Sequence, residues 1–165
     1  MLSRRVLLGS MAAGAVLSPA DRLIGKPRMG GRIRVAGIVA STADTLDPAK
    51  GGNSSDYMRL FLLYSGLTQF DGALRAQPGL AEAIETDDNI VWTIRLRRGV
   101  QFHNGKSLTA DDVVYSLMRH KDPAVGSKVK AVAEQFAGAR RVGPLEVELR
   151  LNGPNPDIPI ILAQA

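Results

Sequence analysis

The 165-residue sequence contains no cysteine. This absence excludes disulfide bonds, thiolate-bound metal sites, a cysteine nucleophile and membrane anchoring through a lipid-modified cysteine. Beyond residue 20 there is no apolar run of membrane-spanning length, and the sequence has no internal repeats or low-complexity tracts. The chain is 45% hydrophobic and 22% charged, which is typical of a folded globular domain.

Motifs of the common enzyme classes are missing as well. The sequence has no GxSxG, no Walker-type glycine loop, no GxGxxG and no HExxH. Ser54, Ser55 and Ser116 have no candidate base near them in the sequence. We therefore predict no enzymatic activity, no cofactor and no metal site.

The excess of positive charge is small. Lysine and arginine number 21 and acidic residues 16. Arg4 and Arg5 are two of the 21, so residues 21–165 keep 19 basic against 16 acidic side chains. Nucleic-acid binders usually gather basic residues on one face, whereas the two signs are interspersed here, so no nucleic-acid partner is predicted.

The first twenty residues, MLSRRVLLGSMAAGAVLSPA, are typical of an export signal. Arg4 and Arg5 precede an apolar run from Val6 to Leu17, and Ser18-Pro19-Ala20 has the small-x-small pattern of a cleavage site. The SRRVLL stretch resembles the twin-arginine export motif. The general export route and an uncleaved anchor are the alternatives.

These features predict a division of the chain into three parts. Residues 1–20 are a signal peptide, residues 21–31 a linker, and residues 32–165 the folded part. We expect the mature product to be periplasmic or otherwise extracytoplasmic.

Alternation of apolar and polar residues predicts strands over 32–39, 89–96 and 145–151. Two further short strands are expected around the Asp71-Gly72 turn. One more short strand is expected at 100–102, before the Asn104-Gly105 turn.

Helices are predicted at three places. One covers 57–64, capped by Ser55 or Asp56. A short helical turn is expected over 78–85, and a longer helix over 110–120. The apolar segment 158–165 resembles the first turns of another element.

Asp111 and Asp112 could serve as an acid–base pair only if their carboxylates converged on one substrate. Adjacent helical residues point about 100° apart. The sequence Thr-Ala-Asp-Asp instead predicts a helix start, with Thr109 as the N-cap and Asp112 at the third helical position.

The two histidines and the arginine cluster also have structural interpretations. His103 is predicted to be a solvent-facing turn residue, and His120 a helix C-terminal residue favoured by the dipole, since their spacing does not suit a local metal site. Arg95 and Arg97 share the polar face of a strand, where they are expected to be solvated or to form salt bridges. Contacts of the histidines with a metal or substrate, and of the arginines with an anion or nucleic acid, are the alternatives.

The order of motifs resembles the N-terminal part of the extracytoplasmic solute-binding proteins, family 5. These are the oligopeptide, dipeptide and nickel receptors of ABC transporters. The most specific block, WTIRLRRGVQFHNGKSLTADDVVYSLMR, runs from Trp92 to Arg119. Ser107 departs from the pattern, because family members often have proline there. The resemblance covers most of residues 30–163.

The resemblance implies a mixed α/β fold with two lobes that close on the ligand. This chain resembles only about the first third of such a protein: an incomplete lobe I with its extra subdomain, without the second lobe. We therefore expect a truncated or fragmentary portion that does not bind ligand well alone.

The resemblance also implies where the ligand contacts lie. In the family the loop after the first strand faces the cleft, and its backbone can pair with an extended peptide. In this sequence that loop is Ser41 to Leu46, with Thr42, Ala43 and Asp44 as the expected contacts. Peptides or other small solutes and the permease subunits of an ABC importer are the expected partners, and the protein is expected to be a monomer.

Two other functions stay open. The chain could be a stand-alone periplasmic interaction module or chaperone that uses this subdomain. An enzyme that uses Asp111 or Asp112 is the remaining alternative.

Overall fold

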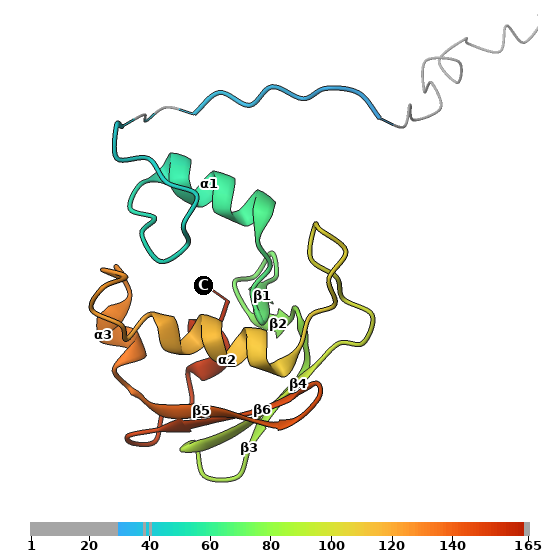
Figure 1. Ribbon diagram of the computed structural model, residues 1–165, viewed down its shortest axis with the longest axis vertical. Helices are drawn as coiled ribbons and strands as arrows, with labels where there is room; N and C mark the ends of the chain where they lie inside the picture. The colour runs from blue at the N-terminus through green and yellow to red at the C-terminus, as the bar shows by residue number, and fades with distance from the viewer. Residues whose placement is uncertain (1–29, 38, 40, 164–165) are drawn as a thin grey trace, which may run out of the picture. The chain divides into compact units, whose positions relative to one another are not determined.

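A computed structural model describes residues 30–37, 39 and 41–163 (Figure 1). The chain divides into two units, residues 1–35 and 36–165. The predicted signal peptide and most of the predicted linker lie outside the described residues.

The strand predicted over 32–39 is not found. The described residues of this segment carry no strand assignment, and Ile33 and Val35 are 88% and 65% exposed. A strand needs a neighbour to satisfy its backbone N–H and C=O groups, and none of the described strands pairs with this segment. Alternation of apolar residues was therefore not sufficient to form a strand.

A four-stranded antiparallel sheet forms the base of the second unit (Figure 1). Its order is β3 (Ala81–Thr86), β4 (Val91–Leu96), β6 (Glu146–Leu151) and β5 (Phe136–Gly143). The two central strands were predicted from their alternation. In their register Trp92 lies opposite Leu149, and Ile94 lies opposite Val147.

Helix α2 (Ala110–Arg119) packs on β5 and β6. Its Val113 and Leu117 are buried in the same core as Ile94 and Leu149. Burial of aliphatic side chains contributes about 1.5–3 kcal/mol each, so this layer supplies most of the apolar stabilisation. The predicted helix is confirmed.

The helical turn predicted over 78–85 is wrong, because most of this segment is strand β3. Alanine and glutamate favour helices, but pairing with β4 and burial of Ala81 override that weak preference. Gly79 precedes the strand at a close approach of two backbones. A Cβ there would lie 2.5 Å from the carbonyl oxygen of Gly66, so a larger residue would force the chains apart.

Strand β5 was not predicted. It is an edge strand, interrupted by two irregularities in its register. Its glycines and its Arg140-Arg141 pair are typical of a protected edge and obscure the alternation that would identify a strand.

The remaining elements flank this layer. The predicted hairpin exists as β1 (Thr68–Phe70) and β2 (Ala76–Pro78). Gln101 and Ser107 form only an isolated bridge, although the Asn104-Gly105 turn is present. Three further helices complete the unit: α1 (Ser54–Leu63), α3 (Lys130–Ala133) and α4 (Ile158–Ile161).

Candidate functional site

The predicted ligand contacts lie in a loop of residues 41–52, which leads into α1. The side chain of Asn53, rather than the predicted Ser55 or Asp56, caps this helix. Asn53 Oδ1 accepts from the backbone N–H groups of Ser55 (2.9 Å) and Asp56 (3.0 Å). The helix ends at Leu63, earlier than predicted.

The carboxylate of Asp56 is the centre of the loop's hydrogen bonding. It is 2% exposed and accepts from the backbone N–H groups of Thr45 (3.0 Å) and Gly52 (3.2 Å). The side-chain amide of Asn53 donates a third bond, at 3.0 Å. Buried charge is stable only when it is paired and hydrogen-bonded. Here the Asp56 carboxylate joins the loop, at Thr45 and Gly52, to the start of α1.

Asp44 is also engaged within the loop region. Its carboxylate accepts from Arg59 Nη1 (3.0 Å), the side chain of Asn53 (3.1 Å) and the backbone N–H of Ser41 (3.1 Å). The hydrogen bond from Arg59 holds the pKa of Asp44 below its usual value of 3.8. The structure therefore gives this side chain a local role in shaping the loop.

Thr42 and Ala43 occupy the exposed turn of the loop. The N–H of Ala43 donates to Ser41 Oγ at 3.1 Å, and the N–H of Asp44 donates to the carbonyl of Ser41 at 3.1 Å. Within the described residues, no hydrogen bond engages the N–H of Thr42. The exposed N–H of Thr42 can therefore pair with an extended peptide. Thr42, Ala43 and Asp44 stay the predicted ligand contacts.

A second ion pair links the loop to the sheet layer. Arg119, at the end of α2, donates from Nη1 to Asp47 Oδ1 (2.8 Å) and from Nη2 to Asp47 Oδ2 (3.1 Å). This two-bond geometry is the strongest form of an arginine–carboxylate pair. Close by, the N–H of Lys128 donates to the carbonyl of Ala49 at 2.8 Å.

An apolar groove of about 590 Å³ lies between α1, α2 and α4. Tyr57 and Phe61 line it from α1, Tyr64 lines it from the position after this helix, and Phe61 is 67% exposed. Leu117 and Leu162 belong to its other walls. Its size is that of a ligand pocket, and its lining is suited to apolar groups.

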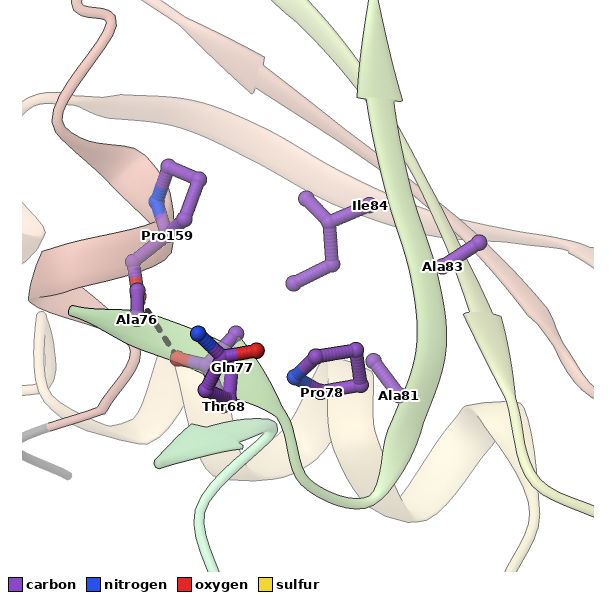
Figure 2. A pocket seen from close by; sticks show the side chains of 8 residues that line it. All are labelled: Thr68, Ala76, Gln77, Pro78, Ala81, Ala83, Ile84 and Pro159. Carbon is purple, nitrogen blue, oxygen red and sulfur yellow. Dashed lines mark hydrogen bonds between the residues drawn. The ribbon is translucent and has the colours of Figure 1, made fainter. Parts of the chain in front are cut away.

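A much smaller hollow, of about 160 Å³, lies where the β1–β2 hairpin meets β3 and α4 (Figure 2). Thr68 Oγ1 donates to the carbonyl of Pro159 at 2.6 Å across this junction. Ligand pockets usually exceed about 300 Å³, so this hollow is a feature of packing between elements.

The Asp-Asp pair is a helix start, as predicted. Thr109 Oγ1 accepts from the N–H of Asp112 (3.4 Å), and Asp112 Oδ2 accepts from the N–H of Thr109 (2.9 Å). The side-chain hydrogen bond from Thr109 keeps the pKa of Asp112 low. Asp111 instead pairs with Arg141, at 2.8 Å. The two carboxylates have separate partners and do not converge on one point.

The histidines differ from each other. His103 is exposed, as predicted, and its Nε2 lies 3.1 Å from the carbonyl oxygen of Leu63. His120 does follow α2, but burial, together with the charge of Arg119, lowers its pKa. A favourable charge–dipole interaction requires the protonated ring. The lowered pKa disfavours that protonated form, so it works against the predicted dipole role. Its Nδ1 lies 2.8 Å from Ser127 Oγ.

The arginines of the motif make structural contacts. Arg95 pairs with Glu85 on the neighbouring strand, which confirms the predicted ion pairing. Arg97 Nε donates to the carbonyl of Gly79 at 2.6 Å. In the part of the chain that the structure describes, no three histidine or acidic side chains gather as a metal site, and no helix there is long and apolar enough to cross a bilayer.

Sequence reasoning missed the role of Asp47 within the 41–52 loop and three residues that bond to the loop from outside it: Asp56, Arg59 and Arg119. The only local sign was the density of Asp, Asn and Ser before α1, which predicts a turn-rich loop. Nothing in the sequence indicated that Arg119 would reach Asp47, because the two residues are 72 positions apart.

Comparisons with known proteins all point to one family. The profile of the bacterial extracellular solute-binding proteins, family 5 (middle part), matches residues 75–165. The oligopeptide-binding protein AppA of Bacillus subtilis is 39% identical over 108 residues, which are 64% of this chain and 20% of that protein. The glutathione-binding protein GsiB of Escherichia coli K12 is 30% identical over 117 residues, or 70% of this chain and 23% of that protein.

Solved structures of similar proteins have the same fold over the matched part. NikZ of Campylobacter jejuni, in complex with Ni(L-His), superposes with a TM-score of 0.66 at 28% identity, over 73% of this chain and 24% of that one. The nonapeptide complex of B. subtilis AppA gives 0.68 at 26% identity, over 72% and 24%. The mixed α/β fragment of a periplasmic binding protein fold is thereby confirmed.

The chain spans about a fifth to a quarter of the length of these relatives. The names of AppA and GsiB describe solute-binding proteins and not enzymes. The profile match covers more than half of the sequence, and the chain therefore belongs to the bacterial extracellular solute-binding proteins, family 5.

Proposed function

We propose that this chain is the N-terminal portion of the extracytoplasmic substrate-binding component of an ABC importer for peptides or related solutes. The observation that carries the proposal is the family match over residues 75–165. The exposed turn at Thr42 and Ala43 supports it, because it offers backbone groups to an extended ligand.

The ligand would lie between two lobes, which close by a hinge motion and present the closed form to membrane permease subunits. An N-terminal export signal, with the twin-arginine route favoured over the general one, would deliver the protein to the periplasm. The binding component acts as a monomer in this proposal.

A chimera tests the ligand loop. Residues 41–163 of this chain replace the matched segment of B. subtilis AppA, and calorimetry measures nonapeptide binding. We expect an affinity within about tenfold of that of unmodified AppA, a change of about 1.4 kcal/mol. A chimera that folds but does not bind would refute the assignment of the loop.

A matched variant of the chimera tests the role of the backbone. Thr42→Pro removes the N–H donor and is expected to weaken peptide binding by about tenfold, the value of one net hydrogen bond. Thr42→Ala keeps the donor and is expected to bind normally.

The chain alone is expected to bind mixed di- to pentapeptides weakly or not at all, because one lobe supplies only half of a cleft. Micromolar binding by the chain alone would contradict this expectation.

The apolar groove favours a second candidate, a stand-alone periplasmic interaction module or chaperone. Phe61 and Phe102 line the groove and are 67% and 42% exposed, so the surface could hold apolar segments of unfolded proteins. This function predicts that the chain suppresses aggregation of reduced insulin, and that Phe61→Ser abolishes the effect. Leu74→Ser, which changes an exposed residue outside the groove, is the control.

A further inference from the structure

The Arg119–Asp47 ion pair joins the most diagnostic motif of the sequence to the 41–52 loop. Both guanidinium Nη atoms bond to the carboxylate, at 2.8 and 3.1 Å. The two side chains are 24% and 28% exposed. The pair is therefore partly shielded from water, and its geometry fixes the direction of the carboxylate as well as its position.

Asp47 transmits this constraint along the loop. Its Oδ1 also accepts from the N–H of Ala49 at 3.0 Å, and its own N–H donates to Thr45 Oγ1 at 3.0 Å. Thr45 in turn donates its N–H to buried Asp56. A chain of hydrogen bonds thus runs from α2 to the residue that follows Asp44.

The electrostatics favour the ionised pair. The hydrogen bond from Arg119 is the largest cause of a lowered pKa at Asp47, and the same bond raises the pKa of Arg119. His120 lies next to this pair, and its own pKa is lowered by burial and by Arg119.

The loop has little apolar anchoring of its own. Of residues 41–52, only Ala49 and Gly51 are buried. Neither side chain offers much apolar area, so polar contacts hold the loop. These are the bonds to the carboxylates of Asp44, Asp47 and Asp56, together with those from the Tyr64 hydroxyl to the carbonyl of Leu46 (3.0 Å) and from the Lys128 N–H to the carbonyl of Ala49 (2.8 Å). Asp44 and Asp56 connect the loop to α1, whereas Asp47 connects it to the sheet layer through α2.

We propose that Arg119 is a positioning residue for the ligand-contact turn at Thr42 and Ala43, and that it acts through Asp47. Arg119 holds the loop in one conformation before the ligand arrives. A preorganised loop avoids the entropy of ordering during binding. This assignment rests on the proposed function for the identity of the loop as a ligand site.

Hydrogen–deuterium exchange of the full chain, without ligand, tests the positioning. In Arg119→Lys the charge remains but the two-bond fork is lost. We expect the hydrogen-bonded amides of the loop to exchange at least about tenfold faster, since bonds to charged groups are among the stronger ones. These are the amides of Ala43, Asp44, Thr45, Asp47, Ala49 and Lys50. Exchange in β4 and β6, and the melting temperature, should not change.

A second variant, Asp47→Asn, tests the same ion pair from the carboxylate side. It is expected to accelerate the same amides, and the double variant should add little to either single change, because both remove one interaction. The matched control is Arg141→Lys, which alters the 2.8 Å pair with Asp111 at the other end of α2. This control should leave loop exchange unchanged.

Unchanged loop exchange in Arg119→Lys and Asp47→Asn would overturn the proposal. Equal acceleration in the loop and the sheet would also overturn it, because Arg119 would then have a general structural role. Placed in the AppA chimera, Arg119→Lys should weaken nonapeptide binding without lowering the melting temperature. Failure of the unsubstituted chimera to bind would refute the proposed function alone and leave the exchange result standing.

Discussion

The sheet layer and the 41–52 loop are held together by different forces. The four strands and α2 enclose a continuous apolar core that includes Ile94, Val147 and Leu149, each fully buried. The loop depends instead on three carboxylates, each hydrogen-bonded to backbone or to arginine. Apolar burial is non-directional, whereas the loop's bonds depend on geometry and on charge. The layer is therefore a robust scaffold, and the loop keeps its shape through directional polar bonds.

The largest effect is expected from breaking the scaffold. Leu149→Ala removes a side chain with no exposed surface and leaves a cavity beside Trp92. We expect it to lower the free energy of unfolding by about 2–5 kcal/mol, measured by urea denaturation. Leu62→Ala, at a residue that is 74% exposed, should change it by less than about 0.5 kcal/mol. Similar losses in both variants would contradict the core described above.

A smaller and more local effect is expected from the loop's buried carboxylate. Asp56→Asn keeps the shape but gives up an acceptor for the N–H groups of Thr45 and Gly52. The expected cost is about 1–3 kcal/mol, seen as faster amide exchange over residues 44–52. Asp87→Asn, at an exposed residue, is the control. Loss of exchange protection in the sheet would show that the two regions are not separable.

The cap of α2 lies within the sheet layer but depends on polar bonds. It therefore tests the contrast between apolar burial in the layer and polar bonding in the loop. Thr109→Ala removes the acceptor for the N–H of Asp112 and is expected to cost about 1 kcal/mol in thermal unfolding. Thr109→Ser keeps the hydroxyl and should retain most of that stability. If both variants are equally destabilised, packing of the threonine methyl group is the cause, and the cap is not.

Acidification is expected to have the smallest effect on the stability of the whole chain, and to weaken the loop before the sheet layer. The pKa values of Asp44 and Asp47 are lower in the folded chain than their usual 3.8. Their stabilisation is therefore full above about pH 4 and is lost as the pH falls through the lower folded-state values. Amide exchange, corrected for its intrinsic pH dependence, should show the loop losing protection before the central strands. Simultaneous loss would contradict the difference in forces.

Much of the scaffold could be predicted from local patterns. Alternation predicted the central strands β4 and β6, and Thr109 with Asp112 predicted the start of α2. These features depend on neighbours in the sequence, which a pattern contains. Strand β3 could not be predicted in this way, because its Ala- and Glu-rich sequence favours a helix and only pairing with β4 makes it a strand.

The sequence by itself determined the family, the two central strands and the capped helix, and it gave a prediction for the position of the ligand turn. Only the tertiary structure decided how that turn is held. Asp47 and Arg119 are 72 positions apart, and no periodicity or spacing connects them. The physical reason is that an ion pair depends on distance in space, and the packing of α2 on the sheet brings Arg119 within reach of the loop.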